Sequence, residues 1–349
     1  IGGSNNVGAT TISGVTILPA SNIAMPTAGY IGLACLAGNG PATGTVPPLP
    51  AANLVLKAVT IGPNYDTAFA VGSEPTNQTA CNASAVQSTF TGSNSGVLTG
   101  ACGTTNPTTS WPSSQIGDGQ VNDANTFSAD GIGIFSAGCG SVQSYHANKF
   151  VSGYRGIVMI SNPGQYFEVL ANTFDGSTAP FMGIGIHMGG GTVIAKLNDN
   201  VFTNIGETQA ADTSAGTTTG YGMLMTGYDV AQAQRNVFHD NDNGLYLGAP
   251  GPNFDFSNDG VMNNRNQFYC NSKTTTEIGN GYDLVMGYSS SAHVAKLTGN
   301  QWDHAGPSSS VSTTTSANGT DNATNGVVNL DVSGFGLAVG ATCSTGRKN

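Results

Sequence analysis

A short motif, an asparagine followed two residues later by an aromatic side chain, recurs seven times in the second two-thirds of the chain. After each motif comes a glycine that opens a short apolar run, such as the GIVMI run that starts at Gly156. A two-part signal that recurs every few dozen residues is typical of a repeat protein. The motif pairs are Asn125/Phe127, Asn148/Phe150, Asn172/Phe174, Asn200/Phe202, Asn236/Phe238, Asn266/Phe268 and Asn300/Trp302.

The spacing of the two parts indicates which kind of repeat this is. From each glycine to the next motif asparagine there are 16 to 22 residues, whereas from each aromatic residue to its following glycine there are 4 to 24. A constant part and a variable part are expected of a solenoid whose insertions leave the coils at one corner. The apolar runs are too short for helices and are bounded by Gly, Asn and Ser, so each coil is expected to contain short strands. The alternative is a β-sandwich in which the motifs mark turns.

Each part of the motif has an expected role in such a coil. The asparagines should stack at one corner and form a ladder of side-chain hydrogen bonds. The aromatic residue points to the same side as the asparagine and can stack in the core. The glycine should permit a tight bend before the next strand. The predicted ladder consists of Asn125, Asn148, Asn172, Asn200, Asn236, Asn266 and Asn300.

The repeats ANTF, ANKF, DNVF, RNVF, RNQF and GNQW resemble those of the right-handed parallel β-helix superfamily, which has the pectate-lyase-like fold and includes periplasmic copper-accessory relatives. The resemblance covers about residues 125–330 and implies the right-handed sense of the coils. It implies no single activity, because this scaffold carries enzymes, adhesins and phage spikes.

We therefore predict an all-β chain, a right-handed parallel β-helix with two regions. Residues 111–349 should form about seven coils with C-terminal closing strands. Residues 1–110 break the motif, and we expect a β-rich N-terminal cap or entry region there, because a solenoid needs its open ends covered.

The composition limits the partners and the location of the protein. Only 9% of the residues are charged, and the net charge is −10. The few cations are scattered, so nucleic acid is not an expected partner. No apolar run approaches the roughly 20 residues that span a bilayer, so no membrane span is expected. A surface rich in Ser, Thr, Asn and Gly favours a secreted or cell-surface location.

The chain contains six cysteines, at positions 35, 81, 102, 139, 270 and 343. They lack the spacing of a structural zinc site. The even number favours disulfides formed in an oxidising compartment, and proximity in the sequence makes Cys81–Cys102 the expected pair. The alternative is a set of buried free thiols.

Catalytic residues are harder to find. β-Helices that cleave polysaccharides use clustered carboxylates, as a general acid and base or as calcium ligands. The densest cluster here is His239, Asp240 and Asp242, followed by Asp255, and these are the candidates if the protein is an enzyme. Asp and Asn are equally common in solvated turns. No motif for a cofactor stands out, so neither a cofactor nor a metal is expected.

Three functions remain open at this point. The favoured one is a secreted or cell-surface structural or adhesive β-helix that self-assembles into filaments or layers. The second is a polysaccharide-acting enzyme, either a lyase, a glycosidase or a phage-type depolymerase. The third is a non-catalytic carbohydrate-binding protein, and further copies of the chain or a surface glycan are the expected partners. The tyrosines available for the third function are Tyr221, Tyr228, Tyr246, Tyr282 and Tyr288.

Overall fold

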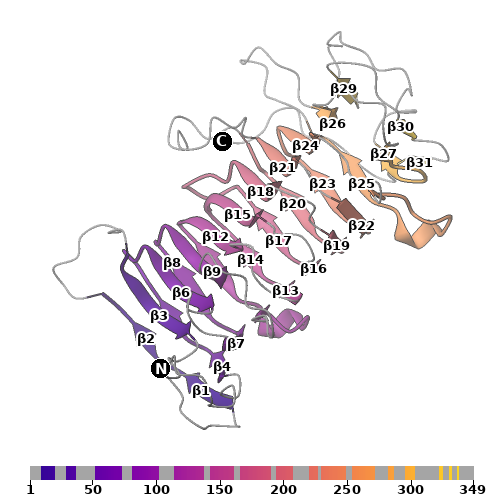
Figure 1. Cartoon of the computed structure of the whole chain (residues 1–349). Helices are drawn as coiled ribbons and strands as arrows, with labels where there is room; N and C mark the ends of the chain where they lie inside the picture. The colour runs from indigo at the N-terminus through magenta and orange to yellow at the C-terminus, as the bar shows by residue number, and fades with distance from the viewer. Residues whose placement is uncertain are drawn as a thin grey trace.

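The chain folds as a right-handed parallel β-helix, as the sequence predicts (Figure 1). In the computed structural model, the described residues are 9–19, 29–36, 52–72, 81–101, 114–136, 142–160, 166–189, 194–206, 220–226, 229–248, 254–271, 282–286, 295–302, 322–324, 330–331 and 336–337. Almost every strand in these ranges belongs to one of three sheets, A, B and C, and pairs in parallel with the equivalent strand of the next coil.

The strands follow one another along each sheet in sequence order. Sheet A contains β1 (Ala9–Ser13), β4 (Ala52–Lys57), β7 (Cys81–Val86), β10 (Ser114–Ile116), β13 (Val142–His146), β16 (Tyr166–Leu170), β19 (Ile194–Asn198) and β22 (Asp229–Gln234). Sheet B contains β2 (Thr16–Ile17), β5 (Thr60–Ile61), β8 (Thr89–Thr91), β11 (Thr126–Ser128), β14 (Lys149–Phe150), β17 (Thr173–Asp175), β20 (Val201–Thr203), β23 (Val237–His239), β25 (Gln267–Tyr269), β28 (Gln301–Trp302) and β31 (Gly336–Leu337).

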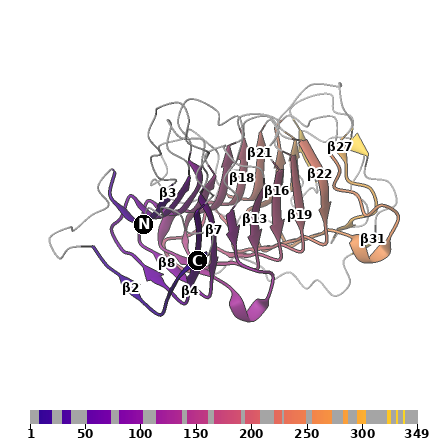
Figure 2. The same cartoon turned by 60° about the horizontal axis from the view of Figure 1, so that its bottom comes forward.

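Sheet C completes each coil. It contains β3 (Ile31–Leu36), β6 (Thr67–Gly72), β9 (Ser95–Ala101), β12 (Asp130–Ser136), β15 (Gly153–Ile160), β18 (Ile184–Gly189), β21 (Tyr221–Thr226), β24 (Asn243–Leu247), β26 (Tyr282–Met286) and β29 (Asn322–Thr324). Strands β27 (Ala295–Lys296) and β30 (Leu330–Asp331) pair separately, and the 3₁₀ helices η1 (Val121–Asp123) and η2 (Met262–Asn264) lie between sheets A and B. Figures 1 and 2 show the coils stacked in order from the indigo N-terminal end to the orange C-terminal third.

A column of stacked aromatic rings runs through the core, one ring from each of eight successive sheet B strands. Neighbouring ring centroids lie 4.5–5.0 Å apart, and the ring planes are within 19° of parallel. Offset stacking of this kind stabilises the contact beyond simple burial. The column consists of Phe90, Phe127, Phe150, Phe174, Phe202, Phe238, Phe268 and Trp302.

The glycines of sheet C make room for these rings. A Cβ built on Gly185 would lie 2.7 Å from Cδ1 of Phe202 and 2.5 Å from the carbonyl oxygen of Gly222. Gly156 stands in the same relation to the ring of Phe174. The glycine therefore recurs with the aromatic residue because the ring of one coil packs over the glycine of the coil before it. Of the glycines singled out in the sequence, Gly156 and Gly244 have this packing role, whereas Gly220, with a φ of 93° directly before β21, has the predicted role of a bend before the strand.

The described parts of residues 1–110 contain coils of the same β-helix. Strands β1 to β9 belong to the same three sheets as the rest of the chain. In these coils Val15, Val59 and Ser88 precede the sheet B strand where later coils have asparagine, and Ile17 and Ile61 continue the ring column in register with Phe90. The motif did not reveal these coils because none has the asparagine, and the first two have isoleucine in place of the ring.

The structure also corrects the predicted disulfide. Cys35 in β3 is bonded to Cys81 in β7, with a Cα–Cα distance of 5.8 Å, so the predicted Cys81–Cys102 pair is wrong. Cys102 lies outside the described residues. Proximity in the sequence was a poor guide, because coiling brings residues 46 positions apart to the same corner. None of the described cysteines is free.

Removing one ring should test the column. Phe202→Ala is expected to lower the free energy of unfolding by about 3–5 kcal/mol, because it leaves a cavity between two stacked rings. The control is Phe181→Ala, since Phe181 is an exposed phenylalanine outside the column. Equal losses for the two variants in urea unfolding would show that the column does not stabilise the fold.

Candidate functional site

A continuous ladder of asparagine side chains runs along the corner between sheets A and B. All seven predicted asparagines are buried, and the Nδ2 of each of the first six donates a hydrogen bond to Oδ1 of the asparagine in the next coil, at 2.9–3.1 Å. The structure thus brings together the seven residues singled out in the sequence: Asn125, Asn148, Asn172, Asn200, Asn236, Asn266 and Asn300.

Each ladder amide also satisfies backbone groups of the preceding coil, as Asn200 shows. Oδ1 of Asn200 accepts hydrogen bonds from the backbone N–H of Asn172, at 3.1 Å, and from the Asn172 side chain. Nδ2 of Asn200 donates to the carbonyl of Val169, at 2.8 Å, as well as to Asn236. A primary amide has two donors and two acceptor positions, so this side chain uses all of them. The buried turn backbone would otherwise lack partners.

The turn before the ladder has an unusual backbone. The residue that precedes the ladder asparagine has positive φ in successive coils, for example 57° at Ala171, 61° at Asp199 and 56° at Arg235. This left-handed conformation is unfavourable for residues other than glycine. The hydrogen bonds of the ladder hold the chain in this tight two-residue turn.

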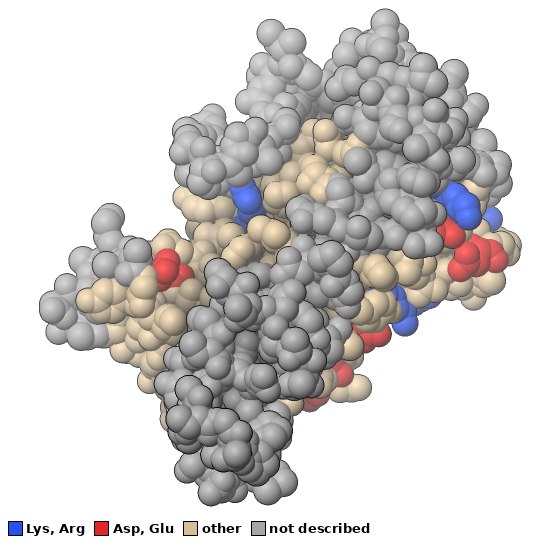
Figure 3. All heavy atoms as spheres, viewed as in Figure 1, with Lys and Arg blue, Asp and Glu red and all other residues tan. Residues whose placement is uncertain are grey.

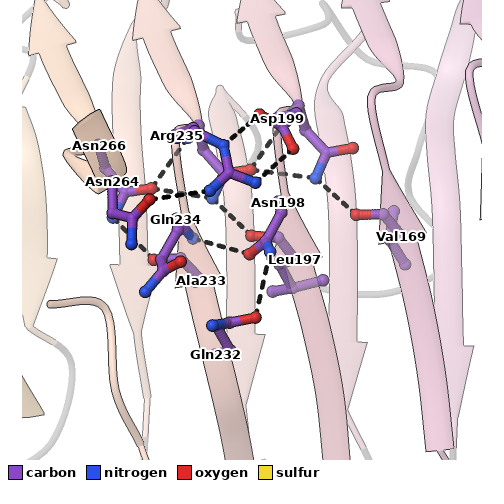
Figure 4. Close-up of polar contacts among 12 residues, drawn as sticks. Val169, Leu197, Asn198, Asp199, Gln232, Ala233, Gln234, Arg235, Asn264 and Asn266 are labelled. Carbon is purple, nitrogen blue, oxygen red and sulfur yellow. Dashed lines mark hydrogen bonds and ion pairs between the residues drawn. The ribbon is translucent and has the colours of Figure 1, made fainter. Parts of the chain in front are cut away.

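An ion pair lies on the outer side of the same corner (Figure 4). Arg235 donates to both carboxylate oxygens of Asp199, at 2.6 and 2.7 Å, and its Nη1 donates to Asn264, at 3.0 Å. The hydrogen bond to Asp199 raises the pKa of Arg235 above its usual value. Both partners are partly exposed, so the pair contributes at most about 1 kcal/mol to stability. It links the turns of two neighbouring coils.

A second, shorter ladder lies between sheets B and C and was not predicted. Asn241 Nδ2 donates to Asn271 Oδ1 at 3.0 Å, and Asn271 Nδ2 donates to Asp283 Oδ1 at 2.7 Å. Asn241 and Asn271 each follow a main-ladder asparagine, Asn236 or Asn266, by five residues. This repeated spacing of five residues is the sequence signal from which the second ladder could have been predicted.

Two of the catalytic candidates are adjacent. Nδ1 of His239 lies 2.8 Å from a carboxylate oxygen of Asp240, in the turn that follows β23. The imidazole stacks on the ring of Tyr269 in the next coil, with centroids 5.1 Å apart. The pair therefore has a defined orientation on the outer side of sheet B.

The other two candidates lie elsewhere. Asp242 is buried just before β24, and its backbone N–H donates to Ile205. Asp255 lies on the sheet A side, where its backbone N–H donates to Val230 of β22 and its carboxylate accepts from the N–H of Ser257. The cluster that looked dense in the sequence is therefore divided between two sides of the coil. Over the described ranges, no three His, Cys, Asp or Glu side chains are grouped as metal ligands.

Of the tyrosines considered for carbohydrate binding, Tyr221 is buried and Tyr246 is partly buried, and their rings meet edge to face at 5.3 Å. Tyr228 and Tyr288 lie outside the described residues, and of Tyr282 only the backbone is described. In the face shown in Figure 3, charged atoms are few and scattered among the described residues, in keeping with the composition. No helix among these residues is long and apolar enough to cross a membrane.

One buried acid has a perturbed pKa. Oδ1 of Asp130 accepts a hydrogen bond from the N–H of Ser93 at 2.9 Å, at the corner between sheets B and C. Burial raises the pKa of Asp130 to about 8, and hydrogen bonds from the backbone of Ser93 and Ser128 oppose the shift only in part. Asp130 is therefore protonated at neutral pH, as expected of a carboxyl in a poorly solvated corner.

No protein-family model matches the chain, and no curated protein and no solved structure matches it at a significant level.

Asn200→Leu should test the main ladder. The substitution leaves the N–H of Asn172 and the carbonyl of Val169 without their partners, so the free energy of unfolding should fall by about 1–3 kcal/mol. Asn263→Leu is the control, since Asn263 is exposed in η2. If both variants unfold at the same urea concentration as the wild type, the ladder is not needed for stability.

Asp130 should make stability depend on pH. Its pKa is about 8 in the folded chain, against an ordinary value of 3.8 when the chain is unfolded, so between these values only the folded chain holds the proton. The free energy of unfolding should therefore decrease as pH rises from about 4 to about 8. Asp130→Asn should remove this part of the slope, and the exposed Asp118→Asn should not. Identical slopes for the wild type and Asp130→Asn in urea unfolding would contradict the assignment.

Proposed function

We propose that this chain is an extracellular structural or adhesive protein whose β-helix acts as a stiff rod. The observation that carries the proposal is the uninterrupted pair of columns. The asparagine ladder extends over seven successive coils, and the ring column over eight. Both columns join the coils in which they lie to their neighbours.

The stiffness follows from how the coils are joined. Each coil contacts the next through parallel strand pairing in the sheets, a buried amide-to-amide hydrogen bond and a ring stack. Bending the rod would open these contacts on one side, and each buried hydrogen bond left unmade costs about 1–3 kcal/mol. A rod of this kind transmits force or holds an attached group at a fixed distance, which are tasks of structural and adhesive proteins.

Two further observations support an extracellular location. The disulfide between Cys35 and Cys81 is typical of proteins that fold in an oxidising compartment. Only 9% of the residues are charged, and neutral polar side chains cover the surface instead. We also propose membership of the pectate-lyase-like superfamily, on the strength of the parallel coils and the asparagine ladder.

The main rival is a polysaccharide-acting enzyme, for which His239 and Asp240 are the remaining adjacent candidates. Incubation of the purified protein with acidic and neutral polysaccharides is expected to release no products. Turnover that disappears in an Asp240→Asn variant would replace the structural proposal with the enzymatic one.

Location is tested separately. Antibodies raised against the purified protein should label intact cells, or material outside them, in immunogold electron microscopy of the organism that makes it. Labelling confined to the cell interior would contradict the proposal. Binding of the purified protein to isolated surface glycans would show that its function is adhesive.

A further inference from the structure

Two matching protrusions interrupt the row of tight turns at the corner between sheets A and B. The η1 protrusion comprises residues 118–124, and the η2 protrusion comprises residues 259–265. Each begins with Asp-Gly, has an apolar residue first in its 3₁₀ helix, and ends directly before a ladder asparagine. Figures 1 and 2 show the two on the same side of the stacked coils, η1 in magenta and η2 in orange.

Both protrusions are anchored to the preceding coil in the same way. In η1, the carbonyl of Asp123 accepts a hydrogen bond from the backbone N–H of Gln87 at 3.0 Å, and its carboxylate accepts one from the Gln87 side chain. In η2, the carbonyl of Asn264 accepts from the backbone N–H of Arg235 at 3.3 Å, and its side chain accepts from Arg235 Nη1 at 3.0 Å. Gln87 and Arg235 have positive φ, 53° and 56°, and each directly precedes the ladder position of its coil. The repeated anchoring holds both protrusions in an equivalent orientation.

The two protrusions lie a fixed distance apart along the rod. Five strand spacings of sheet B separate β11, which follows η1, from β25, which follows η2. At about 4.8 Å per spacing, the protrusions are about 24 Å apart. The four coils between them have only the tight turn at this corner, and each of these turns is described. A partner that contacts both protrusions must therefore offer two sites at this separation.

The surfaces of the protrusions are apolar in one case and acidic in the other. Met262 in η2 is 70% exposed, more than any other large hydrophobic residue in the described ranges, and the adjacent Val261 is 49% exposed. Neighbouring apolar side chains in water are typical of a surface that contacts another molecule. The η1 protrusion contains Asp118 and Asp123 and no basic residue. The η2 protrusion ends in Arg265, whose Nε has no hydrogen-bond partner among the described residues.

We infer that the two protrusions bind a second copy of this chain, which lies alongside the first in the antiparallel direction. A two-fold axis midway between the protrusions places η1 of each copy opposite η2 of the other, so the two separations match by symmetry. Met262 then leaves water against the partner, and the acidic η1 protrusion faces the one that carries Arg265. A parallel copy would instead bring the two acidic η1 protrusions together, which is electrostatically unfavourable.

The inference rests on the proposed structural function and names the surface by which two rods associate. The same surface of both copies takes part, so the contact closes on itself and gives a dimer. Pairing along the A–B corner leaves the ends of both rods and the outer faces of sheet C free of the contact.

Sedimentation equilibrium of the full chain tests the contact. The wild type should form dimers, and Met262→Lys should raise the dissociation constant about tenfold or more, because pairing would bury the new amine. The control is Ile160→Lys, since Ile160 ends β15 in sheet C and is 44% exposed, and this variant should dimerise like the wild type. Circular dichroism and thermal unfolding establish that both variants fold. A monomeric wild type would overturn the inference, and so would equal dissociation constants for the wild type and Met262→Lys.

Cross-linking tests the antiparallel arrangement. Asn122→Cys and Asn263→Cys place thiols at exposed positions of η1 and η2. A short bis-maleimide should join the two variants when they are mixed, and should join neither variant to itself. Cross-linking of either variant to itself would overturn the inference. So would a monomeric chain that binds a neutral polysaccharide and loses this binding in Met262→Lys, because the protrusions would then bind a glycan. None of these results depends on where the protein is located, so immunogold labelling can uphold the proposed function when the inference fails.

Discussion

The fold depends on a requirement of the backbone at one corner of every coil. The turn between sheets A and B is buried and tight, and its N–H and carbonyl groups cannot reach water. A glycine alone would permit the turn but would supply no hydrogen bonds. An asparagine side chain supplies both a donor and an acceptor, and stacking one asparagine on the next satisfies each turn with the amide of its neighbour. The same residue repeated in seven successive coils therefore gives a continuous column.

The ring column and the ladder support each other. Because the aromatic residue lies two positions after the asparagine, fixing the corner also fixes the ring, and the 4.5–5.0 Å centroid spacing follows the strand spacing of sheet B. The ring in turn demands a glycine in sheet C of the preceding coil, as at Gly185 beneath Phe202. The asparagine at the corner, the aromatic residue in the core and the glycine in sheet C thus define the coil together.

This coupling explains what the sequence could and could not predict. The fold class and the positions of the later coils were predictable, because pairs such as Asn200 and Phe202 recur with the same spacing in every one of them. A stacked parallel coil requires both residues of the pair together. The early coils were not predictable, because Val59 and Ile61 satisfy the same positions by burial alone and leave no distinctive pattern. The pairing of Cys35 with Cys81 depends on how coils superpose, which spacing along the chain does not reveal. Similarly, Asp240 and Asp255 are close in sequence and lie on different sides of the coil, so the candidate cluster could be judged only in three dimensions.

The central claim is that the asparagine ladder holds the coils together along the rod, and hydrogen exchange of the native protein tests it most directly. The backbone N–H groups of Asn148, Asn172, Asn200, Asn236 and Asn266 each donate to the side chain of the next ladder residue. If the ladder is continuous, these amides should exchange slowly and at similar rates, through opening of the whole helix. Exchange at these positions as fast as in the exposed segment around Asn263 would contradict the account.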